Sequence, residues 1–416
     1  MSDTSPWKSA ERERRVVDGT PRMRWMVRRL IDHDMRATLL AVCPNSEAVA
    51  RAALGAAQEA NAPALFAATL NQVDEDVSYT GFTPASLMDF LRDEADRIGF
   101  SGPILVGLDH GGPWQKDRHV LDELSYAAAM RAVKRSIEAC LDAGYAHLHI
   151  DPTIDRRLPE EETPAIDWVV DRTVELMAHA EQYRERHDHP PVSYEVGTDE
   201  VGPIDLEEIG QLMERLEAAL RRSGLADAWP CFIVGRVGTE LHTGHFDAEA
   251  ARALRRRTEP YGALVKGHYT DYVDRPEAYP IAGMGGANVG PGLADVEYRA
   301  VQRLVDLEEQ LGGTSGFEEV VHAAVVESGR WKKWLRDDEQ GRPFDALDPE
   351  RQAWLLRTGS RYVWADPAVR SARSALYQNV SAYRDPDAFV HWRIKTAILE
   401  YTHAFNLVDF NERVTG

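Results

Sequence analysis

The 416-residue chain contains only three cysteines, Cys43, Cys140 and Cys231. None of them stands in a Cys-x-x-Cys pair, which argues against a disulfide framework and against a thiolate metal site. No apolar run approaches the length of a membrane span, and the first 18 residues are polar and charged, without the apolar core of a secretion signal. We therefore expect a soluble protein of the cytoplasm.

Basic side chains are also scarce. Lysine occurs seven times, and acidic residues outnumber basic ones by 68 to 48, which gives a formal net charge of −20. A charge of this sign disfavours nucleic acid and anionic membranes as partners unless basic residues gather in one patch. Residues 252–257 are locally basic, but their helix-like setting favours a solvated helix face. We expect neither a nucleic-acid nor a membrane partner.

Nucleotide-binding motifs are missing as well. No G-x-G-x-x-G follows the first expected strand, and there is no phosphate loop and no pair of carboxylates at a spacing suited to magnesium. These absences argue against a dinucleotide-binding sheet and against a kinase.

The chain does contain a repeating pattern of short apolar runs that end in polar or glycine-rich residues. The runs cover residues 37–44, 64–71, 104–110, 147–153, 192–198, 231–238, 263–269 and 281–291. Helical spacing follows at 46–60, 84–98, 121–143, 164–186, 205–223 and 247–258, with Asp205 and Asp247 as expected N-caps. Strands that alternate with helices form parallel sheets, and eight such units predict a closed (β/α)8 TIM barrel. A doubly wound open sheet is the alternative.

The chain beyond the eighth unit has a different character. Hydrophobic residues make up 44% of the sequence, enough for a large core, and the length exceeds that of a usual single domain. We expect a barrel domain over residues 1–315 and a C-terminal helical extension over 316–416, rich in Trp and Tyr. The extension could cover the barrel mouth, make an oligomer contact, or simply pack against the barrel.

The stretch at 104–114, Ile-Leu-Val-Gly-Leu-Asp-His-Gly-Gly-Pro-Trp, is the clearest local signal. An apolar run that switches to Asp109-His110 and then to glycines is typical of a buried strand that delivers an acid and an imidazole into a cleft. Neighbouring strand residues point to opposite faces, so both can reach one ligand only where the strand ends. A locally bonded histidine and a helix-capping aspartate are the alternative.

Polar residues follow the other expected strands too, and in a TIM barrel all strand ends meet at one rim. Three histidines with carboxylates suit zinc or another divalent ion and leave a coordination position for substrate oxygens. Glu195 lies in an apolar run, so it needs a cation or a hydrogen-bond donor. The rim set is Asn71, Gln72, Asp109, His110, Asp151, Glu195, His242 in preference to His245, His268, Asp271 and Asn288.

With these residues assembled, the chain resembles the tagatose-1,6-bisphosphate aldolase Z-subunit family. That family includes sugar-phosphate 4-epimerases and is related to the class II, metal-dependent aldolases. The resemblance covers nearly the whole chain and rests on short motifs at 71–73, 79–84, 107–113, 197–198, 268–272, 289–291, 331–334 and 361–364. It implies that Asp109 is the acid/base at the C4 hydroxyl of the substrate. It also implies that the metal ligands are His110, His242, His268 and Glu195.

Two positions depart from these relatives. The aldolases have a Gly-Gly-Ser-Gly loop after the last ligand histidine, which cradles a C1 phosphate, whereas this chain has Tyr-Thr-Asp-Tyr at 269–272. Its bulky and acidic side chains would repel a phosphate. Asn288 stands where many members of the family have a lysine. The first departure favours a substrate whose C1 end is small, and the second argues against a distal phosphate.

The residues and the resemblance together predict a metal-dependent enzyme that epimerises a ketose or ketose 6-phosphate at C4, of the tagatose/fructose type. The divalent ion, zinc or else manganese, cobalt or nickel, stabilises the enediolate of a retro-aldol or proton-removal step, with Asp109 and Glu195 as catalytic residues. Arg361 is expected to reach a distal phosphate or carboxylate. Further substrate contacts are expected from Asn71, Gln72, Asp151, Asp271 and Asn288.

Two other functions are consistent with the same resemblance. One is a class II tagatose-bisphosphate aldolase, and the other is a non-catalytic subunit that stabilises such an aldolase. The expected partners are accordingly a small sugar or sugar phosphate and either a second copy of the chain or an aldolase subunit.

Overall fold

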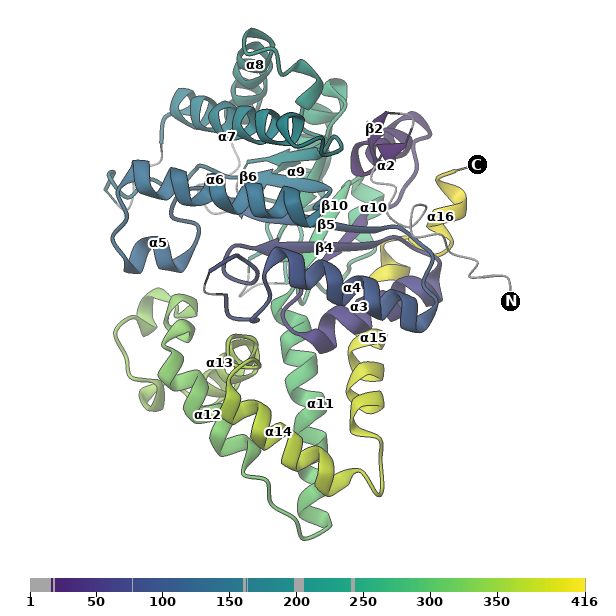
Figure 1. Cartoon of the computed structure of the whole chain (residues 1–416), viewed down its shortest axis with the longest axis vertical. Helices are drawn as coiled ribbons and strands as arrows, with labels where there is room; N and C mark the ends of the chain where they lie inside the picture. The colour runs from purple at the N-terminus through teal and green to yellow at the C-terminus, as the bar shows by residue number, and fades with distance from the viewer. Residues whose placement is uncertain are drawn as a thin grey trace.

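The computed structural model describes residues 16–17, 19–76, 78–159, 162, 164–197, 206–240 and 244–415. It confirms the predicted TIM barrel, because eight parallel strands close in the order β10-β3-β4-β5-β6-β7-β8-β9 (Figure 1). The strands are β3 (Leu39–Val42), β4 (Ala64–Thr69), β5 (Ile104–Gly111), β6 (His147–Ile150), β7 (Ser193–Val196), β8 (Phe232–Val234), β9 (Leu264–Gly267) and β10 (Gly286–Val289).

Helices surround this barrel, and α3 and α9 begin at capping side chains. Ser46 accepts a hydrogen bond from the Val49 amide at the start of α3, and Asp247 caps α9 as expected. Asp205 lies outside the described residues. The helices are α3 (Glu47–Ala60), α4 (Pro84–Ile98), α5 (Asp117–Leu121), α6 (Tyr126–Ala143), α7 (Ile166–Arg186), α8 (Leu206–Arg222), α9 (Ala248–Thr258), α10 (Ala278–Ala282) and α11 (Pro291–Gln310).

The eighth strand is shorter than the apolar run predicted, and its first part is helical. Residues 281 and 282 belong to α10, which ends at Gly283 in the left-handed region, with φ of 80°. The apolar side chains of α10 look like a strand in the sequence, but the glycines that follow separate it from β10. The prediction of a strand from residue 281 was therefore wrong at its start.

A short N-terminal segment packs against the barrel. The strands β1 (Val16–Val17) and β2 (Thr20–Pro21) form an antiparallel pair, and α2 (Arg22–Asp32) follows. Met23, Met26 and Leu30 of α2 are buried. Met23 lines the barrel interior, as does Phe232 of β8.

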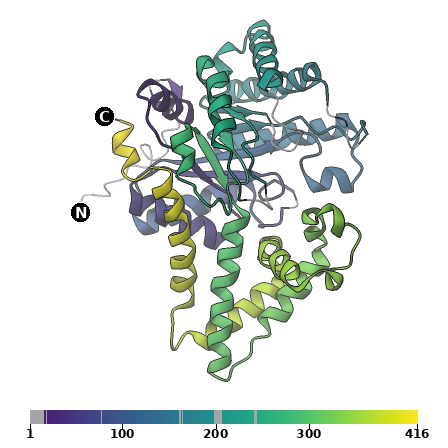
Figure 2. The same ribbon diagram turned by 180° about the vertical axis from the view of Figure 1, so that it is seen from behind.

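The C-terminal helices form a layer beside α11, which extends away from the barrel (Figures 1 and 2). They are α12 (Phe317–Ser328), α13 (Pro349–Gly359), α14 (Pro367–Val380), α15 (Pro386–Ala404) and α16 (Phe410–Arg413). Four 3-10 turns connect them: η3 (Arg330–Trp334), η4 (Asp337–Glu339), η5 (Phe344–Ala346) and η6 (Ser360–Tyr362). The division of the chain at residue 316 stays a prediction.

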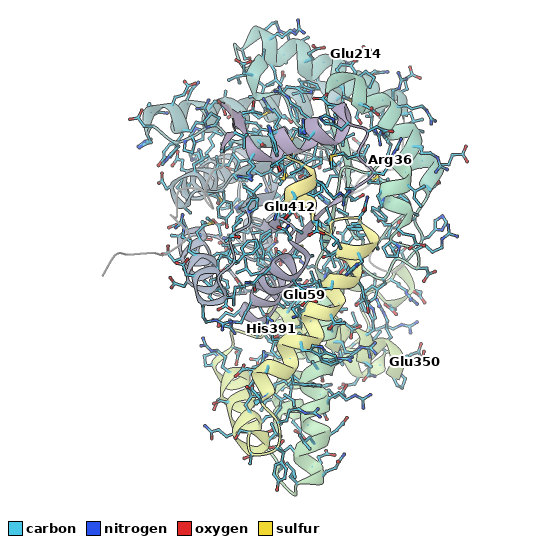
Figure 3. All side chains as sticks on the ribbon, turned by 90° about the vertical axis from the view of Figure 1, so that its right-hand side faces the viewer. Arg36, Glu59, Glu214, Glu350, His391 and Glu412 are labelled. Atoms are coloured by element: carbon cyan, nitrogen blue, oxygen red, sulfur yellow. The ribbon has the colours of Figure 1, made fainter. Side chains whose placement is uncertain are left out.

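Helix α15 returns from this layer to the barrel and packs on α3 and α11. Figure 3 shows its approach to α3, where Glu59 and His391 lie close together. The contact is tight, because a Cβ at Gly55 of α3 would lie 3.1 Å from the His391 ring. Among the described residues no helix has the length and apolar character that crossing a membrane requires.

Candidate metal centre at the barrel mouth

An irregular end of β5 brings Asp109 and His110 to one cavity. The pairing register between β5 and β6 shifts between Leu108 and Gly111, which marks a β-bulge. Within it, His110 adopts a left-handed conformation with φ of 51°, which is uncommon for a residue with a side chain. Because the bulge breaks the alternation of the strand, both side chains line the same cavity.

The backbone after the bulge requires glycine. A Cβ at Gly112 would lie 1.7 Å from the carbonyl oxygen of Asp151, well inside van der Waals contact. The Gly-Gly that marks this stretch in the sequence therefore lets β5 approach the end of β6 closely.

Four side chains at the mouth present donor atoms within 4.8 Å of one another: Asp109, His110, His149 and His268. Asp109 and His149 are joined by a hydrogen bond of 3.0 Å between Oδ1 and Nδ1. One carboxylate oxygen with three imidazole nitrogens is a donor set that zinc and similar divalent ions bind. On the chemistry of its donors, the cluster fits the metal that the sequence analysis predicts.

His149 is the member of this cluster that sequence reasoning missed. It lies in the run His147-Leu148-His149-Ile150-Asp151, of which only Asp151 was predicted to be a site residue. Alternate residues of a strand share a face, so His147, His149 and Asp151 point toward the same side. That alternation is the signal that could have found His149.

Asp151 was predicted to contact substrate, but it lies behind His110, outside the cavity lining. Its Oδ2 lies 2.8 Å from His110 Nδ1 and 2.7 Å from Gln115 Nε2, while Oδ1 accepts a hydrogen bond from Thr153. The side chain is fully buried and is not among the residues that line the cavity. By contacting Nδ1 of His110, Asp151 fixes the orientation of that ring in the cluster.

Glu195 lies next to the cluster but not among its four members. Lys266 Nζ is 2.6 Å from Glu195 Oε2, which meets the predicted need for a cation, and His147 and His268 lie 3.0 and 3.2 Å from its carboxylate. Burial alone raises the pKa of Glu195, but Lys266 and the imidazoles around it outweigh burial and hold the pKa well below its ordinary value. Metal binding by Glu195 stays a prediction.

The Asp109 carboxylate is held in its ionised form. Burial alone would raise its pKa, but His110 and His268, the hydrogen bond from His149, and Lys266 together lower the pKa well below the ordinary value. Asn288 donates a hydrogen bond of 3.2 Å from Nδ2 to the other oxygen, Oδ2. Asp109 is thus an ionised carboxylate whose two oxygens are oriented by His149 and Asn288 in a buried setting.

The remaining predicted residues fall into two groups. Asn71, Gln72, Asn288 and Arg361 line the same cavity of about 380 Å³. His242 lies outside the described residues, and its neighbour His245 is exposed.

Asp271 also lines the cavity, but it is bonded to the backbone at the start of α11. Its Oδ1 accepts hydrogen bonds from the amides of Gly290 and Gly292, at 3.0 and 2.6 Å. Helix N-termini near the seventh and eighth strands are where TIM barrels frequently bind phosphate. In this chain a carboxylate of the protein occupies those amides.

The fold and rim define a TIM-barrel protein whose strand ends carry a donor cluster suited to a divalent ion. Residues 25–401 match the family described as D-tagatose-1,6-bisphosphate aldolase subunit GatZ/KbaZ-like. The chain belongs to this family, which is one of carbohydrate metabolism.

The similarity to individual family members is distributed over most of the chain. A protein of Klebsiella pneumoniae, named D-tagatose-1,6-bisphosphate aldolase subunit GatZ, is 28% identical over 375 residues, covering 84% of this chain and 85% of that protein. A protein of the same name from Salmonella heidelberg is 27% identical over 375 residues, covering 82% and 84%.

Two solved structures show the same fold. A probable tagatose 6 phosphate kinase from Sinorhizobium meliloti has a TM-score of 0.71 at 24% identity, covering 91% of this chain and 98% of that one. The fructuronate-tagaturonate epimerase UxaE from Cohnella laeviribosi has a TM-score of 0.56 at 11% identity, covering 89% and 82%.

Proposed function

We propose that this protein is a metal-dependent ketose 4-epimerase that interconverts sugars of the tagatose and fructose type. The observation that carries the proposal is the buried cluster at the end of β5, in which the ionised Asp109 lies among His110, His149 and His268. An oriented base beside a set of metal ligands is the minimum that this reaction requires.

In the proposed centre the imidazoles bind the metal ion and the neighbouring carboxylates orient the imidazoles. His110, His149 and His268 would hold a divalent ion, which supplies Lewis acidity to the carbonyl and hydroxyl oxygens of the ketose. Asp151 and Glu195 orient two of these rings, since they contact His110 and His268.

The protein's own base then acts at C4. Asp109 takes the proton of the C4 hydroxyl as the C3–C4 bond breaks, so that C4 becomes an aldehyde carbon and the bond electrons form an enediolate over C2 and C3. When the aldehyde turns before the bond re-forms, the opposite face of C4 is attacked. Asp109 returns the proton to the new hydroxyl, and the product is the C4 epimer.

Asn288 supports this geometry from β10. Its amide nitrogen binds Asp109, while its Oδ1 is buried without a hydrogen-bond partner among the described residues. A buried acceptor of this kind is costly unless a ligand satisfies it. We assign this oxygen to a substrate hydroxyl.

Asp271 favours epimerisation over cleavage of a bisphosphate. A bisphosphate aldolase needs a phosphate site at each end of the sugar, and the amides of Gly290 and Gly292 already bind the Asp271 carboxylate. A second phosphate would have to displace a buried anion. The names of the relatives, aldolase subunits, favour the two alternatives, a bisphosphate aldolase or a stabilising subunit.

An NMR time course tests the proposal. The protein is given manganese, cobalt or zinc, or no metal, with fructose 6-phosphate, tagatose 6-phosphate or the unphosphorylated ketoses. Asp109→Asn removes the base, and Asp306→Asn, an exposed residue of α11, is the matched control. We expect the C4 epimer without triose, only with metal, and not from Asp109→Asn.

Other outcomes identify the alternatives. Triose release would support the aldolase. A metal-loaded protein that turns over none of the four ketoses would overturn the enzymatic proposal in favour of the stabilising subunit.

A further inference from the structure

We propose that Arg361 and Lys333, which we call the cationic roof, bind an anionic group at the end of the sugar chain. The group is a terminal phosphate or carboxylate. The inference rests on the proposed function only in taking an open-chain sugar as the ligand. Both roof residues come from the 3-10 turns of the C-terminal layer, η6 and η3, and both line the cavity that contains Asp109 and His110.

Arg361 is a buried cation that forms no ion pair among the described residues, although the buried Asp271 carboxylate of the same cavity acts on it electrostatically. Its side chain is 3% exposed, and its guanidinium donates to the carbonyl oxygen of Thr358 and, at 2.9 Å, to the hydroxyl of Tyr362. Both acceptors are neutral, and no carboxylate of the described residues forms an ion pair with Arg361. Asp271 is bonded to the amides of Gly290 and Gly292 and makes no direct ion pair with Arg361, so an anionic ligand would supply the contact that this buried cation lacks.

One carboxylate beside the roof is shared between two cations. Asp117 of α5 pairs with Arg330 at 3.1 Å and with Lys333 at 3.5 Å, so one carboxylate serves two cations. In both views of the ribbon, the segment that follows α12 faces α5 across the barrel mouth (Figures 1 and 2). Among the described residues that line this cavity, Arg361 and Lys333 are the only arginine and lysine, so the positive charge of the lining is concentrated in the roof.

Aromatic rings hold the roof in place. Arg361 and Lys333 lie 4.4 and 5.5 Å from the centroid of the Tyr362 ring, and each lies 5.2 Å from the Trp334 ring. Trp334 donates a hydrogen bond of 2.7 Å to the Tyr362 hydroxyl, which fixes the two rings together. Rings that stabilise cations and exclude water strengthen the attraction of the roof for an anion.

The anion has no comparable site at the start of α11. Asp271 occupies the amides of Gly290 and Gly292, and its own charge repels an anion there. The cavity therefore combines a helix N-terminus closed by a protein carboxylate with two roof cations, of which Lys333 shares Asp117 with Arg330 and Arg361 has no ion pair among the described residues. We infer that the substrate carries one anionic end, and that the roof recognises it.

Calorimetric titration of the full-length, zinc-loaded protein tests the roof without turnover. The probes are D-glucitol 6-phosphate, D-gluconate and neutral D-glucitol, which have no keto group and cannot be epimerised. We expect the anionic probes to bind at least roughly tenfold more tightly than D-glucitol, the usual gain from a charge-assisted contact. The phosphate and carboxylate arms show which anion the roof prefers.

The variants are Arg361→Gln, Lys333→Met and the control Lys332→Met, which removes the same charge from an exposed neighbour outside the cavity. Arg361→Gln and Lys333→Met should each weaken the anionic probes by roughly tenfold and leave D-glucitol unchanged. Lys333→Met addresses the case in which Arg361→Gln does not fold, because the Lys333 side chain is 39% exposed.

The outcomes separate this inference from the proposed function. Equal binding of charged and neutral probes, or equal effects of Lys333→Met and Lys332→Met, would overturn the roof even if epimerisation occurs. Tight, roof-dependent binding of an anionic probe would support the roof even if no ketose is turned over.

Discussion

The buried carboxyl of Asp271 makes the unfolding free energy of the chain depend on pH. Burial raises its pKa to about 6, and the hydrogen bonds from Gly292 and Gly290 and the positive charge of Arg361 only partly offset this effect. The pKa of Asp271 in the folded protein lies above its unfolded value of about 4. The contribution of the protonated Asp271 carboxyl to the unfolding free energy is therefore fully present below about pH 4. It is lost as the pH rises through about 6, where the buried carboxyl ionises.

We therefore predict that Asp271→Asn becomes the more stable protein as the pH rises. The asparagine oxygen can accept the same two amide hydrogen bonds but never ionises. Relative to the variant, the unfolding free energy of the natural chain should fall by about 1 kcal/mol between pH 5 and pH 7.5. Urea unfolding at the two pH values measures the difference in unfolding free energy between the two proteins. If this difference does not change with pH, the pKa of Asp271 is not raised by folding.

Residue by residue, the sequence shows the part of the centre that has a local pattern. Asp109 and His110 stand out because an apolar run ends abruptly at them. His149 is marked only by its alternation with Asp151, and its pairing with Asp109, 40 positions away, forms only when the barrel closes. Lys266 is missed for the same reason, since its pairing with Glu195 joins two strands that are not neighbours in the sheet.

At the scale of the element, the bulge in β5 decides whether the centre forms. Alternation along a regular strand would turn Asp109 and His110 to opposite faces. The sequence predicts that both face one ligand because the strand ends there. The strand instead continues to Gly111 and bulges. A bulge depends on how a strand pairs with its neighbour, which no local pattern records.

The close approach that follows the bulge gives a prediction about Gly112. Gly112→Ala should lower the unfolding free energy by about 1–3 kcal/mol or more, because the added methyl group meets the carbonyl of Asp151. The same change should weaken zinc binding by moving Asp151 away from His110. Thermal unfolding and a zinc titration provide the measurements.

Gly210→Ala is the matched control, because this helical glycine of α8 has 3.6 Å of clearance to Arg257. Alanine is favoured over glycine in a helix, so this variant should be as stable as the natural chain or more so. If both variants behave alike, the tight contact at Gly112 has no energetic consequence.

For the whole molecule, the topology was predictable and the way its parts join was not. Eight alternating units are a strong periodic signal, whereas the contacts of the C-terminal helices depend on surfaces far apart in the sequence. One continuous hydrophobic core includes Leu39 of the barrel, Val321 of α12 and Ile398 of α15. A second, smaller cluster lies around the η turns and contains Trp331, Leu335, Phe344, Leu347 and Leu355.

This division of the core predicts how the chain unfolds. Because the barrel and α15 share one core, the full-length protein should lose both in a single cooperative transition, as parts of one core do. The small cluster beside Lys333 is joined to the larger core through partly buried side chains, Trp334 and Leu356, so we expect it to open locally at lower free energy than the barrel. Hydrogen exchange should be faster at residues 331–347 than in α15, and D-glucitol 6-phosphate should slow it if the roof binds that anion.

Calorimetry and hydrogen exchange together decide between this arrangement and an independent C-terminal domain. Two calorimetric transitions, with α15 exchanging as fast as residues 331–347, would mean that the chain divides near residue 316. A single transition with fast exchange confined to 331–347 would mean that α15 belongs to the barrel and that only the support of the roof moves. The second result is expected, because α15 buries Val390, Ile394 and Ile398 within the larger core.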